Sequence, residues 1–76
     1  MSLLSQMLFV TLREGAWGVW LGRALLSAHP TRTEALGVAQ AAAREAATRG
    51  VETTLFVGDE DGNHVELIIR PAADTA

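Results

Sequence analysis

The sequence has no cysteine, no tyrosine and no lysine, since all six of its basic residues are arginines. Without cysteine the chain has neither a disulfide framework nor a cysteine-based zinc site, so we expect a cytoplasmic protein without a metal or other cofactor. Nine acidic residues leave a net charge of −3. Because nucleic acids carry dense negative charge, this balance disfavours a nucleic-acid partner.

Long hydrophobic runs are absent too. The apolar stretch at residues 1–12 is interrupted by Ser5 and Gln6 and is too short to cross a bilayer, so we expect no membrane contact. We expect one domain over residues 1–76, with an ordered core at about 7–70 and tails at 1–6 and 71–76. A domain of this length buries only roughly 60% of its surface on folding, so pairing with a second copy would add buried area.

Alternating apolar residues predict two strands in the first part of the chain. The first runs from Met7 to Arg13, and Glu14-Gly15 forms the turn that follows. The second begins near Ala16 and extends toward Ser27. Gly18 and Gly22 within it indicate a bulge or the close approach of another backbone or ring.

Residues 31–50 predict one amphipathic helix with both ends encoded in the sequence. Thr31 can cap the first turn, Glu34 can reach back to the amide of Thr31, and Gly50 provides a left-handed stop. The apolar face of this helix is almost all alanine, so the helix adds little apolar volume. Most of the core must therefore come from strands.

Two more strands follow the helix, at residues 51–57 and 64–70. Asp61-Gly62 in the segment between them is a strong signal for a two-residue hairpin turn. The sequence therefore predicts a single small α+β domain of order β-β-α-β-β. Its sheet is expected to be antiparallel, with one helix packed on one face.

The predicted sheet carries large apolar side chains on both faces, although one helix can cover only one of them. The expected helix-covered face consists of Leu8, Val10, Trp17, Val19, Leu55, Val57, Val65, Leu67 and Ile69. The other face carries Met7, Phe9, Trp20, Phe56 and Ile68. Burying such a side chain contributes about 1.5–3 kcal/mol, and large apolar patches mark partner surfaces. We predict a homodimer that pairs through the sheet, face to face or edge to edge, with these five residues at the interface.

Two alternatives to the homodimer stay open. Strand twist, bulges at Gly18 or Gly22 and the N-terminal tail could hide these side chains within a monomer. A different protein partner could also cover them.

No motif in the chain supports catalysis or metal binding. Histidine is the residue type best suited to act as a base or ligand near neutral pH, and no carboxylate in the sequence is placed to orient His29 or His64. The acidic turn at 59–63 resembles the start of a calcium loop, but His64 and Arg70 occupy the positions that need glycine and glutamate. We therefore predict no enzyme and no catalytic, cofactor-binding or metal-binding residue. One alternative is a small-ligand binder or enzyme with a site at a dimer seam near either histidine.

A second alternative is a nucleic-acid-associated accessory protein. Arg13, Arg23 and Arg70 could contact backbone phosphates, and tryptophans can stack on bases. Period-two placement, however, sends Trp17 and Trp20 to opposite faces of the sheet. Core and interface positions are therefore the favoured interpretation for the two tryptophans.

Three motifs resemble the domain of unknown function 2188 family of small bacterial proteins. They are Trp17-Gly18-Val19, the helix start Thr31-Arg-Thr-Glu34-Ala35, and Val57-Gly58 leading into Asp61-Gly62. The resemblance spans most of residues 8–69, and its family has no established activity, so it implies no functional residue. The chain departs from the family in its longer helix, in an extra acidic residue in the hairpin and in its lack of lysine, which disfavours a basic-surface function. The helix start is also similar to that of HicB-type antitoxins, which implies an antitoxin-like protein as a further alternative.

Overall fold

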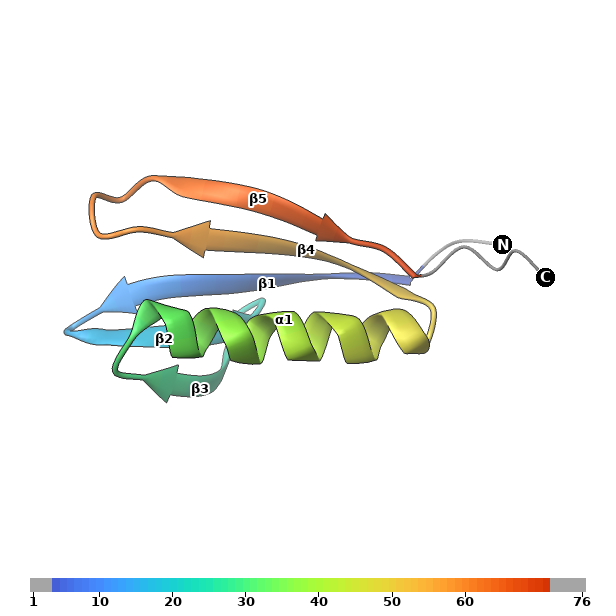
Figure 1. Ribbon diagram of the computed structural model, residues 1–76, viewed down its shortest axis with the longest axis horizontal. Coiled ribbons are helices and arrows are strands. Elements are labelled where there is room, and N and C mark those ends of the chain that lie inside the picture. Colours follow the sequence, from blue (N-terminus) through green and yellow to red (C-terminus); the bar gives the residue numbers. More distant parts are fainter. Residues whose placement is uncertain (1–3, 72–76) are drawn as a thin grey trace.

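The computed structural model describes residues 4–71 as a five-stranded sheet with one helix on one of its faces (Figure 1). The elements in chain order are β1 (Leu4–Arg13), β2 (Ala16–Leu21), β3 (Ala24–His29), α1 (Arg32–Thr48), β4 (Val51–Gly58) and β5 (His64–Ile69). The strand order across the sheet is β3-β2-β1-β4-β5. The predicted α+β class, with one helix against the sheet, is confirmed.

The predicted second strand is in fact two strands, so the order is β-β-β-α-β-β. Leu21 and Ala24 pair with each other, and Gly22 between them has a φ of 58°. A two-residue turn with glycine at its first central position matches this conformation. The prediction of one continuous strand was wrong here because Gly22 turns the chain back.

The prediction that all neighbouring strands are antiparallel was also wrong for one pair. β1 and β4 run parallel, whereas β1–β2, β2–β3 and β4–β5 are antiparallel. The third strand causes the difference, because β3 ends at the same end of the sheet as β1 (Figure 1). α1 then carries the chain back to the opposite end, so β4 starts beside the beginning of β1 and runs in the same direction.

The two ends of α1 are formed by the residues that the sequence indicated. The Thr31 hydroxyl accepts the Glu34 backbone N–H at 3.2 Å, and the Glu34 carboxylate accepts the Thr31 hydroxyl at 3.3 Å. The Glu34 carboxylate was predicted to accept the backbone amide of Thr31, but it accepts the hydroxyl of Thr31 instead. Gly50 follows the helix with a φ of 81°, as expected for a left-handed stop.

The core lies between the helix and the three central strands. Ala35, Ala39 and Ala43 of α1 are fully buried. The buried strand residues are six of the nine predicted for the covered face, with Thr53 in addition: Leu8, Val10, Trp17, Val19, Thr53, Leu55 and Val57. The hydroxyl of Thr53 accepts the Gln6 amide at 3.0 Å. Alanine lets the helix lie close to the sheet, so strand side chains supply most of the buried volume.

β5 lies at the margin of the region that α1 covers. Val65 and Leu67 were expected on the covered face and do share the register of Val57 and Leu55, but they remain 56% and 41% exposed. One alanine-faced helix is too narrow to cover all five strands.

The β4–β5 turn differs from the predicted two-residue hairpin. Asp59 N–H donates to the Asn63 carbonyl at 2.8 Å, which leaves a three-residue loop ending at Gly62 with a φ of 88°. The Asp59 carboxylate accepts the backbone N–H groups of Asp61 and Asn63, each at 2.9 Å. A type I turn followed by a left-handed glycine is the usual conformation of such a loop. The acidic side chain thus stabilises its own turn.

The predicted N-terminal tail is too long. β1 begins at Leu4, which pairs with Val51, so residues 4–6 are part of the sheet. Residues 1–3 and 72–76 of the two predicted tails lie outside the described residues.

Candidate functional site

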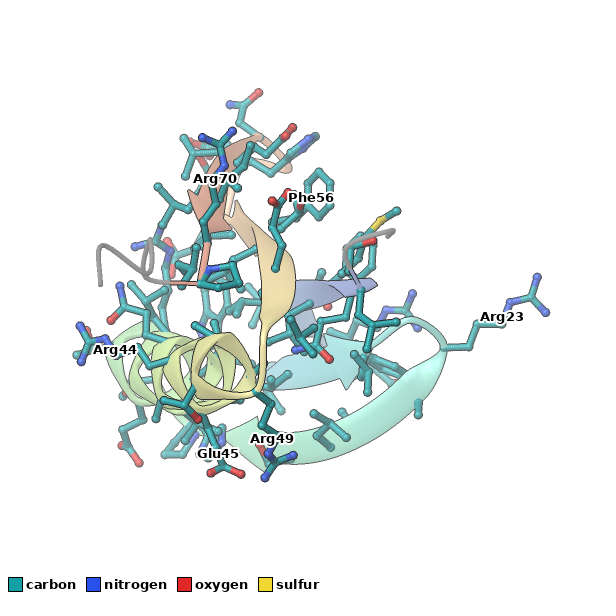
Figure 2. All side chains as sticks on the ribbon, turned by 90° about the vertical axis from the view of Figure 1, so that its right-hand side faces the viewer. Arg23, Arg44, Glu45, Arg49, Phe56 and Arg70 are labelled. Carbon is teal, nitrogen blue, oxygen red and sulfur yellow. The ribbon has the colours of Figure 1, made fainter. Side chains whose placement is uncertain are left out.

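The sheet face opposite α1, which we name the open face, is crossed by a row of apolar side chains. The pairing register places Phe9 of β1 between Trp20 of β2 and Phe56 of β4. Leu25 of β3 continues the row beyond Trp20, and Glu66 of β5 ends it beyond Phe56. The rings of Phe9 and Phe56 stack with centroids 5.0 Å apart and planes 12° apart. Figure 2 shows Phe56 projecting from β4 on the side away from the helix.

Trp20 lies over Gly18, its neighbour on the same face of β2. A Cβ atom at Gly18 would come within 2.7 Å of the indole Nε1 and 3.1 Å of Leu25 Cδ1. The guanidinium of Arg13 lies 5.1 Å from the centre of the indole ring, a cation–π arrangement. The prediction that Gly18 marks the close approach of a ring is therefore confirmed, and the indole is fixed in place from two sides.

All five predicted interface residues lie on the open face. Phe9, Trp20 and Phe56 are half-buried by their neighbours in the row. Met7 and Ile68 flank the row on either side of Thr54 and are 55% and 47% exposed. Together with the 51% exposed Leu25, they form one apolar surface that runs across all five strands of the sheet.

Two shallow hollows meet at the centre of the open face, where Phe9 and Thr11 line both. One, of about 360 Å³, is also lined by Arg13, Trp20, Gly22 and Arg23. The other, of about 300 Å³, reaches the β4–β5 turn and is also lined by Phe56, Asn63 and His64. The Thr11 hydroxyl is buried between them without a hydrogen-bond partner among the described residues. Sequence reasoning did not single out Thr11, because a threonine within an alternating strand is ordinary.

The two histidines are not brought together. His64 packs edge-on against Phe56 on the open face, with ring centroids 6.0 Å apart. His29 pairs with Trp17 in the register and so lies on the helix side of β3, where its Nε2 is 2.9 Å from the Ser27 hydroxyl. Within residues 4–71, no three histidine, aspartate or glutamate side chains converge as metal ligands would.

The three arginines considered for phosphate contacts are spread over the molecule. Arg13 and Arg23 line the same hollow, and Figure 2 shows Arg23 extending far from the rest of the sheet. Arg70 follows β5 at the opposite edge, with its Nε 3.7 Å from the carboxylate of Glu52. Arg13 and Arg23 therefore approach the same hollow from the two ends of β2, Arg70 lies apart from them, and the described residues form no continuous basic patch.

α1, the helix of the described residues, is not long and apolar enough to cross a membrane. No protein-family model matches the chain, and no curated protein or solved structure shows significant similarity to it. The likeness to the domain of unknown function 2188 family thus stays a prediction from three sequence motifs. The geometry of the open face is the basis for any functional assignment.

Proposed function

We propose that this protein is a non-enzymatic cytoplasmic interaction module whose copies associate through the open face of the sheet. The observation that carries the proposal is the aromatic row of Trp20, Phe9 and Phe56, with exposed Met7 and Ile68 beside it. Burying large apolar side chains contributes about 1.5–3 kcal/mol each when they are fully exposed beforehand. A face of this composition is therefore stabilised by a partner that excludes water from it.

A second copy is the partner that this face fits. Phe9 lies on β1, the central strand, with one aromatic residue on each side. Two copies can face each other about a two-fold axis that is parallel to β1 and lies midway between their open faces. This arrangement would place Trp20 against the partner's Phe56, and Phe9 against the partner's Phe9. Such self-complementary contacts are the usual basis of two-fold interfaces.

The size of the open face sets the strength of this association. Five strands about 4.8 Å apart, each contributing five or six residues of about 3.3 Å, give roughly 430 Å² per copy. Two copies would bury about 900 Å², below the standard size of a stable protein interface. We therefore expect an association that depends on concentration, with a Kd in the micromolar range.

Light scattering on a size-exclusion column tests the proposal. Met7→Glu and Trp20→Glu each place a charge on the open face and should lower the average mass at a concentration where the wild type associates. Val38→Glu is the matched control, because Val38 is 39% exposed on α1 and does not lie on the sheet. Circular dichroism confirms that each variant folds. The proposal fails if the two open-face variants keep the wild-type mass while folded.

A single-stranded nucleic-acid partner is the second candidate, favoured by the stacking of Arg13 on Trp20 and by Arg23 in the same hollow. Arginines beside exposed aromatic rings are typical of single-strand binding sites. The test is the fluorescence anisotropy of a labelled thymidine oligonucleotide at low salt. Arg23→Ala should weaken binding, whereas Arg44→Ala on the helix should not. No binding at low salt would exclude this candidate.

A further inference from the structure

β5 forms one edge of the sheet, and no strand of the described residues lies on its outer side (Figure 1). Val65, Leu67 and Ile68 on this strand are 56%, 41% and 47% exposed. The β4–β5 register continues without a shift from Gly58–His64 to Thr53–Ile69. A regular, apolar edge strand is a template for pairing with another chain.

The opposite edge, β3, is also apolar, with Leu25 and Leu26 each 51% exposed, but it is not regular. The register between β2 and β3 shifts between Val19 and Trp20, as at a β-bulge. A β-bulge is one of the features that keep an edge strand from pairing. β5 is therefore the edge at which a strand can be added.

The hydrogen-bond pattern of β5 determines which of its residues can form backbone hydrogen bonds with a strand added at its outer edge. The Asp59–Asn63 hydrogen bond identifies these two residues as a hydrogen-bonded pair at the end of the β4–β5 ladder. Hydrogen-bonded and non-hydrogen-bonded pairs alternate along an antiparallel ladder, so Val65, Leu67 and Ile69 direct their backbone groups toward β4. The N–H and C=O groups of Glu66 and Ile68 therefore point away from β4, toward the outer edge of the sheet. The same alternation gives the backbone groups of Arg70 this outward direction.

We propose that β5 pairs antiparallel with β5 of a second copy, about a two-fold axis at Ile68. In this register Ile68 exchanges both backbone hydrogen bonds with the partner's Ile68. Glu66 lies opposite the partner's Arg70, and symmetry repeats this pair on the other side of the axis. Arg70 is on the same face as Glu66, as its 3.7 Å approach to Glu52 on β4 indicates. Opposite charges directly across two strands stabilise the pairing.

The side chains of β5 on the sheet face that carries α1 support the same register. Leu67 would lie opposite the partner's Ile69, so side chains that α1 does not reach would cover each other. Leu67 is 41% exposed in the single chain. Apolar cross-strand pairs of this kind contribute to sheet stability.

Charge distinguishes this register from two others that use the same outward-facing backbone groups, with their axes at Leu67 and at Glu66. An axis at Leu67 places Glu66 against the partner's Ile68, and His64 against the partner's Arg70, without an ion pair. An axis at Glu66 places the two glutamates against each other, which is destabilising. The axis at Ile68 alone pairs each of these charges with its opposite.

This edge pairing goes beyond the open-face association and does not depend on it. It joins two sheets side by side with both helices on the same side, and it leaves both open faces accessible. Copies that use both interfaces would join into an open-ended chain, because the two-fold axes at β1 and at Ile68 do not intersect, whereas Met7→Glu would leave the edge-paired dimer. The two proposals can therefore fail separately.

Cysteine cross-linking tests the register in a chain that has no cysteine of its own. In Ile68→Cys the two Cα atoms would be about 5.5 Å apart across the axis, within the range of a disulfide. In Leu67→Cys they would be diagonal neighbours about 7–8 Å apart, outside that range. Under mild oxidation, Ile68→Cys should form covalent dimers about tenfold faster than Leu67→Cys, also in the Met7→Glu background. Equal rates, faster cross-linking of Leu67→Cys, or no cross-linking would each overturn the proposal.

Charge reversal provides the second test, with the rate of Ile68→Cys cross-linking as the readout. Glu66→Arg or Arg70→Glu alone should slow it about tenfold, because each replaces two attractive pairs by two repulsive ones. The double variant Glu66→Arg/Arg70→Glu should restore the rate. Glu66→Arg that cross-links as fast as its parent would show that Glu66 is only a surface charge and would overturn the register.

Discussion

Gly18→Ala is the substitution that tests the arrangement of the open face most simply. The new methyl carbon would sit 2.7 Å from Nε1 of Trp20 and 3.1 Å from Cδ1 of Leu25, both closer than ordinary van der Waals contact. The φ of Gly18 is not positive, so the backbone itself accepts alanine. The cost therefore arises from steric overlap with Leu25 and with the indole, whose displacement would also disturb its contact with Arg13.

The expected change in the free energy of unfolding combines one stabilising term with two destabilising terms. Alanine is favoured over glycine within a strand by about 0.5–1 kcal/mol. Overpacking that displaces a ring costs about 1–3 kcal/mol, and loss of the Arg13 contact costs about 0.5–1 kcal/mol at an exposed site. We expect a net loss of about 1 kcal/mol in the free energy of unfolding, which corresponds to a Tm lower by about 4–8 °C.

Gly37→Ala is the matched control for this experiment. Gly37 lies within α1, and a Cβ atom there would meet nothing within 4 Å apart from its chain neighbours and the backbone of its own helix. The same substitution should there raise the free energy of unfolding by about 1 kcal/mol, because alanine is the better helix former. Thermal unfolding at one protein concentration, followed by circular dichroism, measures both variants. If Gly18→Ala were stabilised as Gly37→Ala is, the indole would not lie over Gly18 and the described open face would be wrong.

Two further predictions concern the sheet and the helix. Thr11→Val should raise the free energy of unfolding by about 1 kcal/mol, because it removes a buried hydroxyl without a partner; a loss of stability in urea unfolding would show that this hydroxyl is hydrogen-bonded in solution. Ala39→Leu should lower it by about 1–3 kcal/mol, since Ala39 is fully buried against the sheet. Ala41→Leu on the exposed side of α1 should change it by less than about 0.5 kcal/mol, and equal effects at the two alanines would contradict the described packing.

The helix and the two faces of the sheet were predictable because both depend on local patterns. Thr31 and Gly50 mark the ends of α1 through capping chemistry that acts within a few residues. Period-two alternation assigned Val10 to the covered face and Phe9 to the open face, because neighbouring residues of a strand point to opposite sides.

The remaining features depend on conformation or on distant parts of the chain. Gly22 could form either a bulge or a turn, and only its backbone conformation decides for the turn that starts β3. The parallel pairing of β1 with β4 follows from that additional strand, because it reverses the end of the sheet from which α1 leaves. The buried hydroxyl of Thr11 depends on the rings and strands around it, which lie far apart in the sequence.

Acrylamide quenching of tryptophan fluorescence, measured over a wide range of protein concentrations, tests most directly whether copies associate through the open face. Trp17 is only 5% exposed and should contribute a nearly constant signal, so changes report on Trp20. Pairing at the β5 edge would leave Trp20 accessible, whereas pairing at the open face would cover it. We predict that quenching falls as the concentration rises through the micromolar range and that Met7→Glu abolishes this fall. Quenching that stays constant up to the highest concentration reached would contradict the account.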